Sequence, residues 1–342
     1  MVAQQNSRTK SIHGGNLTLA TKEFGLPADG WIDLSTGINP TCYPNTMISS
    51  QTLRILPTPD NVKNLVDRAR QFYQISNNTG IIAAPGTQSV LQNIPLLYPG
   101  RKITILSPTY SEHRKTWELA GNKVLPVDNF EALLKGDIAV LVNPNNPDGR
   151  SYKKNDLMAL SNNLELLIID EAFCDNSPNL SLAPHLSGNN ILILRSLGKF
   201  FGLAGLRLGF AIGPNEILES LQERLGPWAV SGPAIEIGAR ALSDTPWFIK
   251  MQKQLINQSK QLNSLLKQQS ISILGGTELF TLIQSDRALD LYHDFGNAGI
   301  LVRRFEERKN WLRIGLPGPK REWHKFASVL SQNSNTIDNM SK

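Results

Sequence analysis

Lys199 is the residue in this sequence that most strongly suggests chemistry. It follows a short apolar run, residues 191–194, that predicts a buried strand. A lysine just beyond such a strand carries a large desolvation cost unless its ammonium is paired or chemically used. The use that this position favours is a Schiff base with an aldehyde cofactor, with Ser196 and Arg207 as donors to a phosphate. The alternative is an ordinary surface lysine whose stem is buried and whose charge reaches water.

Ligands of open α/β sheets bind beyond the carboxyl ends of the strands, so the residues after each apolar run matter most. Gly86-Thr87-Gln88 opens a predicted helix after the run 80–84. Free backbone N–H groups at this helix start favour binding of an anion, although such a segment more often only begins a helix. Asp170 ends the run 164–169, where a carboxylate needs a partner. A protonated pyridine nitrogen would be such a partner, and the ion pair would make the pyridine ring a better electron sink. The alternative is that Asp170 caps a helix.

Two further side chains have the same kind of position. Tyr110 follows the run 102–106 and could stack on a planar ring, with core packing as an equal alternative. Asn146 lies in a run of Asn and Pro, residues 143–149, that is typical of a turn and also carries amides able to bond a polar ligand. Each signal is weak alone. Together, at successive strand ends, they supply every group that a phosphorylated pyridine aldehyde needs.

The elements expected to position these residues alternate along the chain. Apolar runs predict strands at 80–84, 102–106, 123–127, 138–142, 164–169, 191–194 and 208–212. Helical patterns fall at 61–75 and then between many of these strands, at 88–98, 111–120 and 155–163. Continuous apolar strands separated by helices indicate an α/β fold, with a mainly parallel sheet covered on both faces.

The pattern changes after residue 216. A long helix is predicted over 245–269, entered through Asp244 as its cap and Pro246 in its first turn. Strands follow at 271–274, 279–284, 300–305 and 311–314, and a last helix lies near 322–330. This part therefore predicts a smaller α+β domain. Residues 1–40 have little periodicity and are expected to be loop-like, and the polar residues after 330 are expected to be disordered.

Composition excludes several classes of protein. The chain has 342 residues, of which 40% are hydrophobic and 19% charged, and no apolar run is long enough to span a membrane. The first ten residues are polar and lack a signal core, so we expect a cytoplasmic protein. Cys42 and Cys174 are far apart and suggest neither a disulfide framework nor a metal site. The net charge of +6 comes from scattered residues with no nucleic-acid motif, which favours a solvated surface with some arginines directed at anionic small molecules.

The motifs from Pro85-Gly86-Thr87-Gln88 to residues 311–315 resemble those of fold-type I enzymes dependent on pyridoxal 5′-phosphate, in the class I/II aminotransferase superfamily. The resemblance covers essentially the whole chain. It implies an N-terminal arm over 1–44 that joins the small domain, a large cofactor-binding domain over 45–228, a small α+β domain over 229–332 and a polar tail over 333–342. It also implies a homodimer.

The same resemblance implies a role for each candidate residue. Lys199 would be the catalytic residue that holds the cofactor aldehyde, Asp170 would pair with the ring nitrogen, and Asn146 would bond the phenolic oxygen. Tyr110 would stack on the ring. Arg313 would grip the substrate carboxylate, for which its planar fork is suited. The cofactor phosphate would be held by Gly86, Thr87, Gln88, Ser196 and Arg207.

A narrower resemblance lies in the N-terminal arm. The segment His13-Gly14-Gly15-Asn16, together with residues 31–40 and 228–233, is similar to the threonine-phosphate decarboxylase family of cobalamin biosynthesis, which is close to the histidinol-phosphate aminotransferases. It implies that the arm closes over a phosphorylated amino-acid substrate. Arg303 would meet the substrate phosphate, and its neighbour Arg304 would be solvated. The arm residues expected near the substrate are His13, Ser35, Thr36, Gly37 and Asn39.

Three functions follow as hypotheses. The first is decarboxylation of L-threonine O-3-phosphate to (R)-1-amino-2-propanol O-2-phosphate and CO2. The second is transamination of histidinol phosphate or a related compound, against which Leu56 counts because that family commonly has a tyrosine there. The third is a non-catalytic partner in cobalamin synthesis, which the intact Lys199 set disfavours. Phe173 and Asp148 replace a common tyrosine and threonine, and the sequence gives no reason for Asp148.

Overall fold

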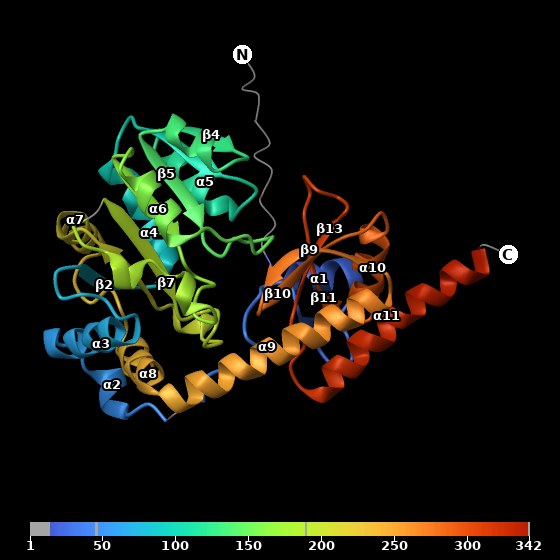
Figure 1. The fold of residues 1–342 in the computed structure, drawn as a ribbon. Helices are drawn as coiled ribbons and strands as arrows, with labels where there is room; N and C mark the ends of the chain where they lie inside the picture. Colours follow the sequence, from blue (N-terminus) through green and yellow to red (C-terminus); the bar gives the residue numbers. More distant parts are fainter. Residues whose placement is uncertain (1–13, 45–46, 189, 341–342) are drawn as a thin grey trace, which may run out of the picture.

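The protein has a large part and a small part, joined by one long helix (Figure 1). The computed structural model describes residues 14–44, 47–188 and 190–340. The large part is built on a seven-stranded sheet of order β2-β8-β7-β6-β5-β3-β4, in which only β8 runs antiparallel to its neighbours. Its strands are β2 (Gly80–Ala84), β3 (Lys102–Leu106), β4 (Lys123–Val127), β5 (Ile138–Val142), β6 (Leu166–Asp170), β7 (Ile191–Ser196) and β8 (Gly209–Gly213).

Hydrophobic side chains are buried on both faces of this sheet. Successive residues of β6 enter different core clusters: Leu167 and Ile169 lie in one, and Ile168 lies in the other. This is the period-2 alternation of a strand covered on both sides, so the predicted α/β fold with a mainly parallel sheet is confirmed. The covering helices are α3 (Pro59–Phe72), α4 (Thr87–Asn93), α5 (Ser111–Leu119), α6 (Lys154–Ser161), α7 (Asn215–Leu225) and α8 (Gly232–Ser243).

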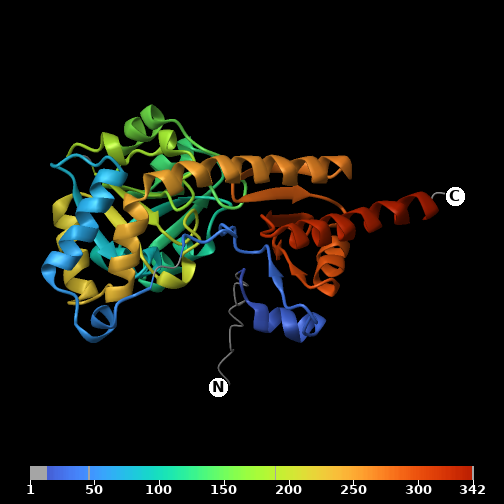
Figure 2. The same ribbon diagram turned by 90° about the horizontal axis from the view of Figure 1, so that it is seen from below.

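Helix α9 (Thr245–Gln268) runs from the large part to the small part (Figures 1 and 2). The predicted cap is present, since the Asp244 side chain accepts a hydrogen bond from the backbone N–H of Trp247 at 3.0 Å. The small part has a four-stranded antiparallel sheet of order β12-β13-β10-β9. Its elements are β9 (Ser272–Thr277), β10 (Phe280–Gln284), α10 (Ala288–Asn297), β12 (Arg303–Arg304), β13 (Trp311–Gly315) and α11 (Lys320–Met340).

The N-terminal arm is more regular than its composition suggested. It contains α1 (Leu17–Phe24), which the prediction of loop-like structure missed. The Asn16 side chain caps this helix by accepting from the backbone N–H of Leu19 at 3.0 Å. Strand β1 (Ile32–Asp33) then pairs in parallel with β11 (Ile300–Leu301), so the arm lies against the small part.

Two predicted divisions of the chain need correction. Helix α8 was placed in the small domain that starts at residue 229, but it packs on α3 and on α2 (Ser50–Arg54) in the large part. The polar tail over 333–342 was expected to be disordered, but α11 continues to Met340. No Gly or Pro interrupts residues 320–340, so nothing in the sequence ends the helix earlier. None of the helices in the described ranges is long and apolar enough to cross a bilayer.

Candidate active site

A cavity of about 880 Å³ lies between the two parts of the molecule. Large-part residues line one side of it, and the arm and the β12–β13 region line the other. The structure thereby brings together candidates that are almost 280 residues apart in sequence. The sequence-predicted residues that line the cavity are Thr36, Tyr110, Asn146, Lys199, Arg303 and Arg313.

Lys199 reaches this cavity from the loop after β7. Its Nζ lies 3.5 Å from the carbonyl oxygen of Thr36 and 5.4 Å from the centre of the Phe173 ring. Burial, and then the positive charge of Arg313, lowers the pKa of Lys199 to about 8. At neutral pH about a tenth of such an amine is unprotonated, which is the nucleophilic form. Lys199 is therefore suited to bond with an aldehyde.

The start of α4 forms a cradle with Arg207. Gly86 has φ +76°, and a Cβ there would come within 2.7 Å of the Arg207 guanidinium. A Cβ on Gly209 would lie 2.9 Å from the backbone nitrogen of Thr87. No side chain caps the first turn of α4, so its N–H groups can bind an anion. Glycines, a helix start and an arginine in contact fit a phosphate. Ser196 also lies nearby, since it pairs with Gly209 in the register of β7 and β8.

Asp170 and Tyr110 both contact His113. Asp170 is almost fully buried, and its Oδ2 lies 3.1 Å from Nε2 of His113. His113 is fully buried and also meets the Tyr110 ring edge-on, with centroids 5.9 Å apart. The Tyr110 hydroxyl donates to the side chain of Gln88 at 3.3 Å, so Gln88 supports Tyr110 as well as starting α4. The carboxylate of Asp170 thus lies at the end of β6, where it can face a protonated ring nitrogen.

His113 is a site residue that the sequence interpretation missed. It lies on α5, three residues after Tyr110, so both side chains fall on one face of the helix start. That spacing was the available signal. A His in contact with Asp170 holds the carboxylate in place and can stabilise its charge.

Arg303 and Arg313 form a pair of positive charges, neither of which has an ion pair with a carboxylate of the described residues. They are directly opposite each other in the register of β12 and β13, where like charges are destabilising. Arg313 is 6% exposed and donates only to neutral acceptors, the side chain of Asn146 and the backbone carbonyl of Ser35. Among the described residues neither arginine has an ion pair, and the buried Nε of Arg313 has no hydrogen-bond partner. Burial, and then Arg303, lowers the pKa of Arg313.

Arg304, the other residue of β12, differs from Arg303 in its charged neighbours. The sequence interpretation left it solvated, but its guanidinium lies 3.7 Å from Glu23 and over the ring of Tyr292. Both arginines line the cavity, and Arg303 is the member of this dipeptide that has no ion pair with a described residue.

The arm residues divide into two kinds. Thr36 lines the cavity, whereas Gly37, with φ +62°, packs so closely that a Cβ would lie 2.9 Å from the Phe280 ring. Asn39 is buried, and its amide donates to the Phe200 carbonyl at 2.7 Å and accepts from Thr41 N at 2.8 Å.

These contacts revise two arm predictions. The prediction that Asn39 binds substrate is not supported, because its polar atoms are used inside the protein. Its backbone N–H also donates to the Lys199 carbonyl at 3.0 Å, so it positions the lysine loop instead. Gly37 allows the arm to pack closely and is absent from the cavity lining. His13 lies outside the described residues.

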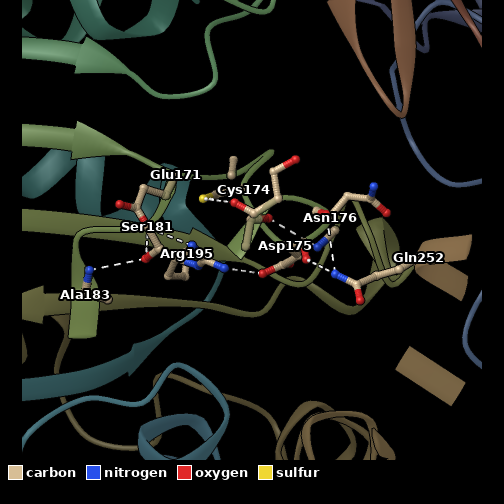
Figure 3. A network of polar contacts seen from close by, with 12 residues as sticks. Glu171, Cys174, Asp175, Asn176, Ser181, Ala183, Arg195 and Gln252 are labelled. Atoms are coloured by element: carbon tan, nitrogen blue, oxygen red, sulfur yellow. Dashed lines mark hydrogen bonds and ion pairs between the residues drawn. The ribbon is translucent and has the colours of Figure 1, made fainter. Parts of the chain in front are cut away.

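A buried ion cluster lies beside the site on β6 and β7. Figure 3 shows the Arg195 guanidinium between the carboxylates of Glu171 and Asp175, with Glu171 Oε2 at 2.6 Å. Glu171 also accepts from the Ser181 hydroxyl at 2.6 Å, and Gln252 of α9 donates to the Asp175 carbonyl at 3.4 Å. The cluster therefore ties two central strands to the helix that joins the two parts.

No group of three or more potential metal ligands occurs within residues 14–44, 47–188 and 190–340. The donors around the cavity are a lysine, arginines, an amide and backbone N–H groups, which suit an organic phosphate better than a metal ion.

Known proteins share both sequence and architecture with this chain. A threonine-phosphate decarboxylase of Sinorhizobium sp. is 38% identical over 94% of this chain and 98% of its own, and one of Pseudomonas aeruginosa is 35% identical over 93% and 96%. A histidinol-phosphate aminotransferase of Sinorhizobium meliloti, solved in complex with pyridoxal 5′-phosphate, superimposes with a TM-score of 0.80 at 17% identity, covering 98% of this chain and 99% of that one. The family model for aminotransferase class I and II matches residues 30–330. The chain therefore belongs to the class I and II aminotransferase family.

Proposed function

We propose that this protein decarboxylates L-threonine O-3-phosphate to (R)-1-amino-2-propanol O-2-phosphate and CO2, with pyridoxal 5′-phosphate as cofactor, for cobalamin biosynthesis. The observation that carries the proposal is the Arg303–Arg313 pair at the cavity that Lys199 also lines. A substrate with both a carboxylate and a phosphate supplies the two anions that this pair lacks. The two relatives at 38% and 35% identity, both threonine-phosphate decarboxylases, support the same reaction.

The residues around the cavity fit the cofactor. Lys199 would bond its aldehyde carbon, Tyr110 would stack on its ring, and Asp170 would pair with its ring nitrogen. Asn146 would bond its phenolic oxygen. The phosphate would bind in the cradle of Gly86, Thr87, Gln88, Ser196 and Arg207. When bound, the cofactor ring accepts the electron pair that is released as a substrate bond breaks.

The substrate would be bound at both ends. Arg313 would hold the carboxylate and Arg303 the phosphate, which fixes the orientation of the bonds at Cα between them. The carboxylate loses its charge as CO2 leaves, so Arg313 orients the leaving group and contributes ground-state binding rather than stabilising new charge. Two-point binding therefore selects which bond at Cα breaks.

Lys199 has a second task after the substrate amine has displaced it. Its amine, with a pKa lowered to about 8, can carry a proton at neutral pH and release it readily. Lys199 would deliver this proton to Cα once CO2 has left, which completes the product. The carbonyl of Thr36 lies within 3.5 Å of Nζ and helps to orient it.

Transamination of a phosphorylated amino compound is the second candidate. The aminotransferase family match and the fold of the histidinol-phosphate aminotransferases favour it. The same two arginines could serve such a substrate only in part, because histidinol phosphate has no carboxylate. Leu56 is 60% exposed and cannot donate the hydrogen bond of the tyrosine common at that position. Decarboxylation is therefore the better match.

We also propose a homodimer. Leu53, Leu56 and Trp228 are large apolar side chains, each more than half exposed, and Leu53 and Leu56 lie in or just after α2. Size-exclusion chromatography with light scattering tests this.

Both cysteines are free, which is consistent with a reducing, cytoplasmic environment.

The reaction is tested by adding carboxyl-labelled L-threonine O-3-phosphate to the purified protein loaded with pyridoxal 5′-phosphate. Release of one CO2 per product amine, without any 2-oxo acid, is expected. The parallel reaction with histidinol phosphate and 2-oxoglutarate is the matched alternative. Formation of glutamate with no CO2 release would show an aminotransferase, and no reaction in either assay would contradict both candidates.

A further inference from the structure

Asp148 has a structural role that its sequence did not reveal. It lies in the turn after β5, two residues beyond Asn146. Its Oδ1 accepts hydrogen bonds from Asn145 Nδ2 at 2.7 Å and from the backbone N–H of Arg150 at 3.2 Å. Its Oδ2 lies 3.4 Å from the Arg150 guanidinium. The carboxylate therefore uses both oxygens to close the turn, which a threonine hydroxyl, with a single oxygen, could not do.

The same cluster fixes the segment before Tyr110. Asn145 Nδ2 donates to the carbonyl of Pro108 at 2.9 Å, and the Arg150 guanidinium donates to that carbonyl at 3.2 Å. The Thr109 hydroxyl donates to Asn145 Oδ1 at 2.8 Å. Asn145 is 2% exposed, and all of its amide hydrogen-bonding groups are occupied. The turn that carries Asn146 and the segment that leads to Tyr110 are thus held as one unit.

This turn also touches the small part through close backbone contacts. A Cβ on Gly149 would lie 1.8 Å from the carbonyl oxygen of Gly276, and a Cβ on Gly275 would lie 2.1 Å from that of Asp148. Any side chain at these glycines would force the two parts away from each other. The contact therefore sets how β9 lies against the large part.

A chain of contacts runs from this turn through the small part and back to the turn. Strand β9 pairs with β10, and β10 pairs with β13, which carries Arg313. Arg313 in turn donates to the side chain of Asn146, in the turn that Asp148 closes. A shift of this turn would move Asn146 and would change the placement of Arg313 relative to it.

We propose that Asp148 is a positioning residue, which holds the 145–150 turn against β9 so that Asn146 and Arg313 stay in contact beside Tyr110. The inference rests on the proposed function only for the identity of the substrate. It predicts that Asp148 affects both substrate binding and the environment of the cofactor without touching either.

The test compares Asp148→Ala with Asp137→Ala in the cofactor-loaded protein. Asp137 accepts from the Lys102 backbone N–H where β3 and β5 begin, at the edge of the sheet away from Tyr110 and Asn146, so its variant is a matched control for a lost carboxylate. For Asp148→Ala, which removes both hydrogen-bond acceptors of the turn, we expect KM for L-threonine phosphate to rise roughly tenfold, with kcat within about threefold of the parent. We also expect the pH midpoint of the bound cofactor's visible absorbance to shift by about one unit without substrate. The control should change neither.

A second variant approaches the contact from the other side. Gly275→Ala leaves the turn unaltered and is compatible with the glycine's backbone conformation, but it forces β9 off Asp148. It should reproduce the absorbance shift even if Asp148→Ala does not fold. Unchanged KM and absorbance midpoint in a folded Asp148→Ala, or in Gly275→Ala, would overturn the proposal. Because the absorbance midpoint needs no turnover, it remains a valid test even if the protein proves not to be a decarboxylase.

Discussion

Two buried arginines of this protein, Arg195 and Arg313, have opposite electrostatic surroundings. Arg195 lies between the carboxylates of Glu171 and Asp175 (Figure 3), and their charges outweigh the effect of burial and raise its pKa well above the ordinary value. Arg313 contacts only neutral acceptors and faces Arg303 across a strand pair, so burial and a like charge lower its pKa. The chain itself pairs the first charge with two carboxylates, whereas the second has no ion pair with a described residue and is left available to a bound anion.

The difference separates arginines that hold the fold from arginines that bind substrate. Removing one partner from a buried ion pair leaves an uncompensated charge and is strongly destabilising. Removing a buried charge that has no partner relieves a desolvation cost instead. Stability and activity should therefore respond in opposite ways at the two positions.

The largest effect on stability is expected for Arg195→Met. It leaves two buried carboxylates without a cation and should lower the free energy of unfolding by about 3–5 kcal/mol. Urea unfolding followed by circular dichroism measures this loss. Asp67→Asn, which breaks an exposed ion pair with Lys63, is the control and should cost less than about 1 kcal/mol. Equal losses in the two variants would remove the distinction between the regions.

The next largest effect is expected on activity, for Arg313→Leu. Loss of the partner for a desolvated carboxylate should lower kcat/KM for L-threonine phosphate by about 100-fold or more, roughly 3 kcal/mol. The melting temperature should stay the same or rise, because the variant removes a buried charge that the described residues do not pair. A large drop in melting temperature would show that Arg313 stabilises the fold as Arg195 does.

A smaller effect links Arg313 to Lys199. Positive charge from Arg313 helps to lower the pKa of Lys199 to about 8, and only the neutral amine bonds to an aldehyde. The rate of cofactor uptake by the cofactor-free protein should therefore rise about tenfold between pH 6 and 7 and level off above pH 8. In Arg313→Leu the midpoint should move to higher pH, because the amine then loses a like charge.

Stopped-flow absorbance after mixing with pyridoxal 5′-phosphate gives these rates. Free N-acetyl-lysine amide, measured over the same pH range, corrects for titration of the cofactor itself. A midpoint that is the same in the parent and in Arg313→Leu would show that Arg313 does not act on the lysine.

The strands, the lysine and the groups around the ring could be predicted because each depends on short-range sequence. Apolar runs mark β2 to β8, and Tyr110, Asn146 and Lys199 each follow one of them. Family resemblance supplied the roles. What the sequence could not provide is where a side chain's hydrogen bonds go after folding.

Asn39 and Asp148 illustrate this limit. The family resemblance places Asn39 near the substrate, yet folding directs its amide to the Phe200 carbonyl, 161 residues away. Asp148 looked like an unexplained substitution until its partners Asn145 and Arg150 were placed around it. The helical tail shows a different limit, because its polar composition is typical of disorder while no Gly or Pro interrupts the helix over residues 320–340.

One measurement tests most directly whether the unpaired arginines bind the two anions of a single substrate. Values of kcat/KM are compared for L-threonine O-3-phosphate and L-threonine, in the parent protein and in Arg303→Gln, by release of CO2. If Arg303 binds the phosphate, its loss should cost roughly 100-fold with the phosphorylated substrate and less than about threefold with threonine. An equal loss with both substrates would contradict the assignment of Arg303 to the substrate phosphate.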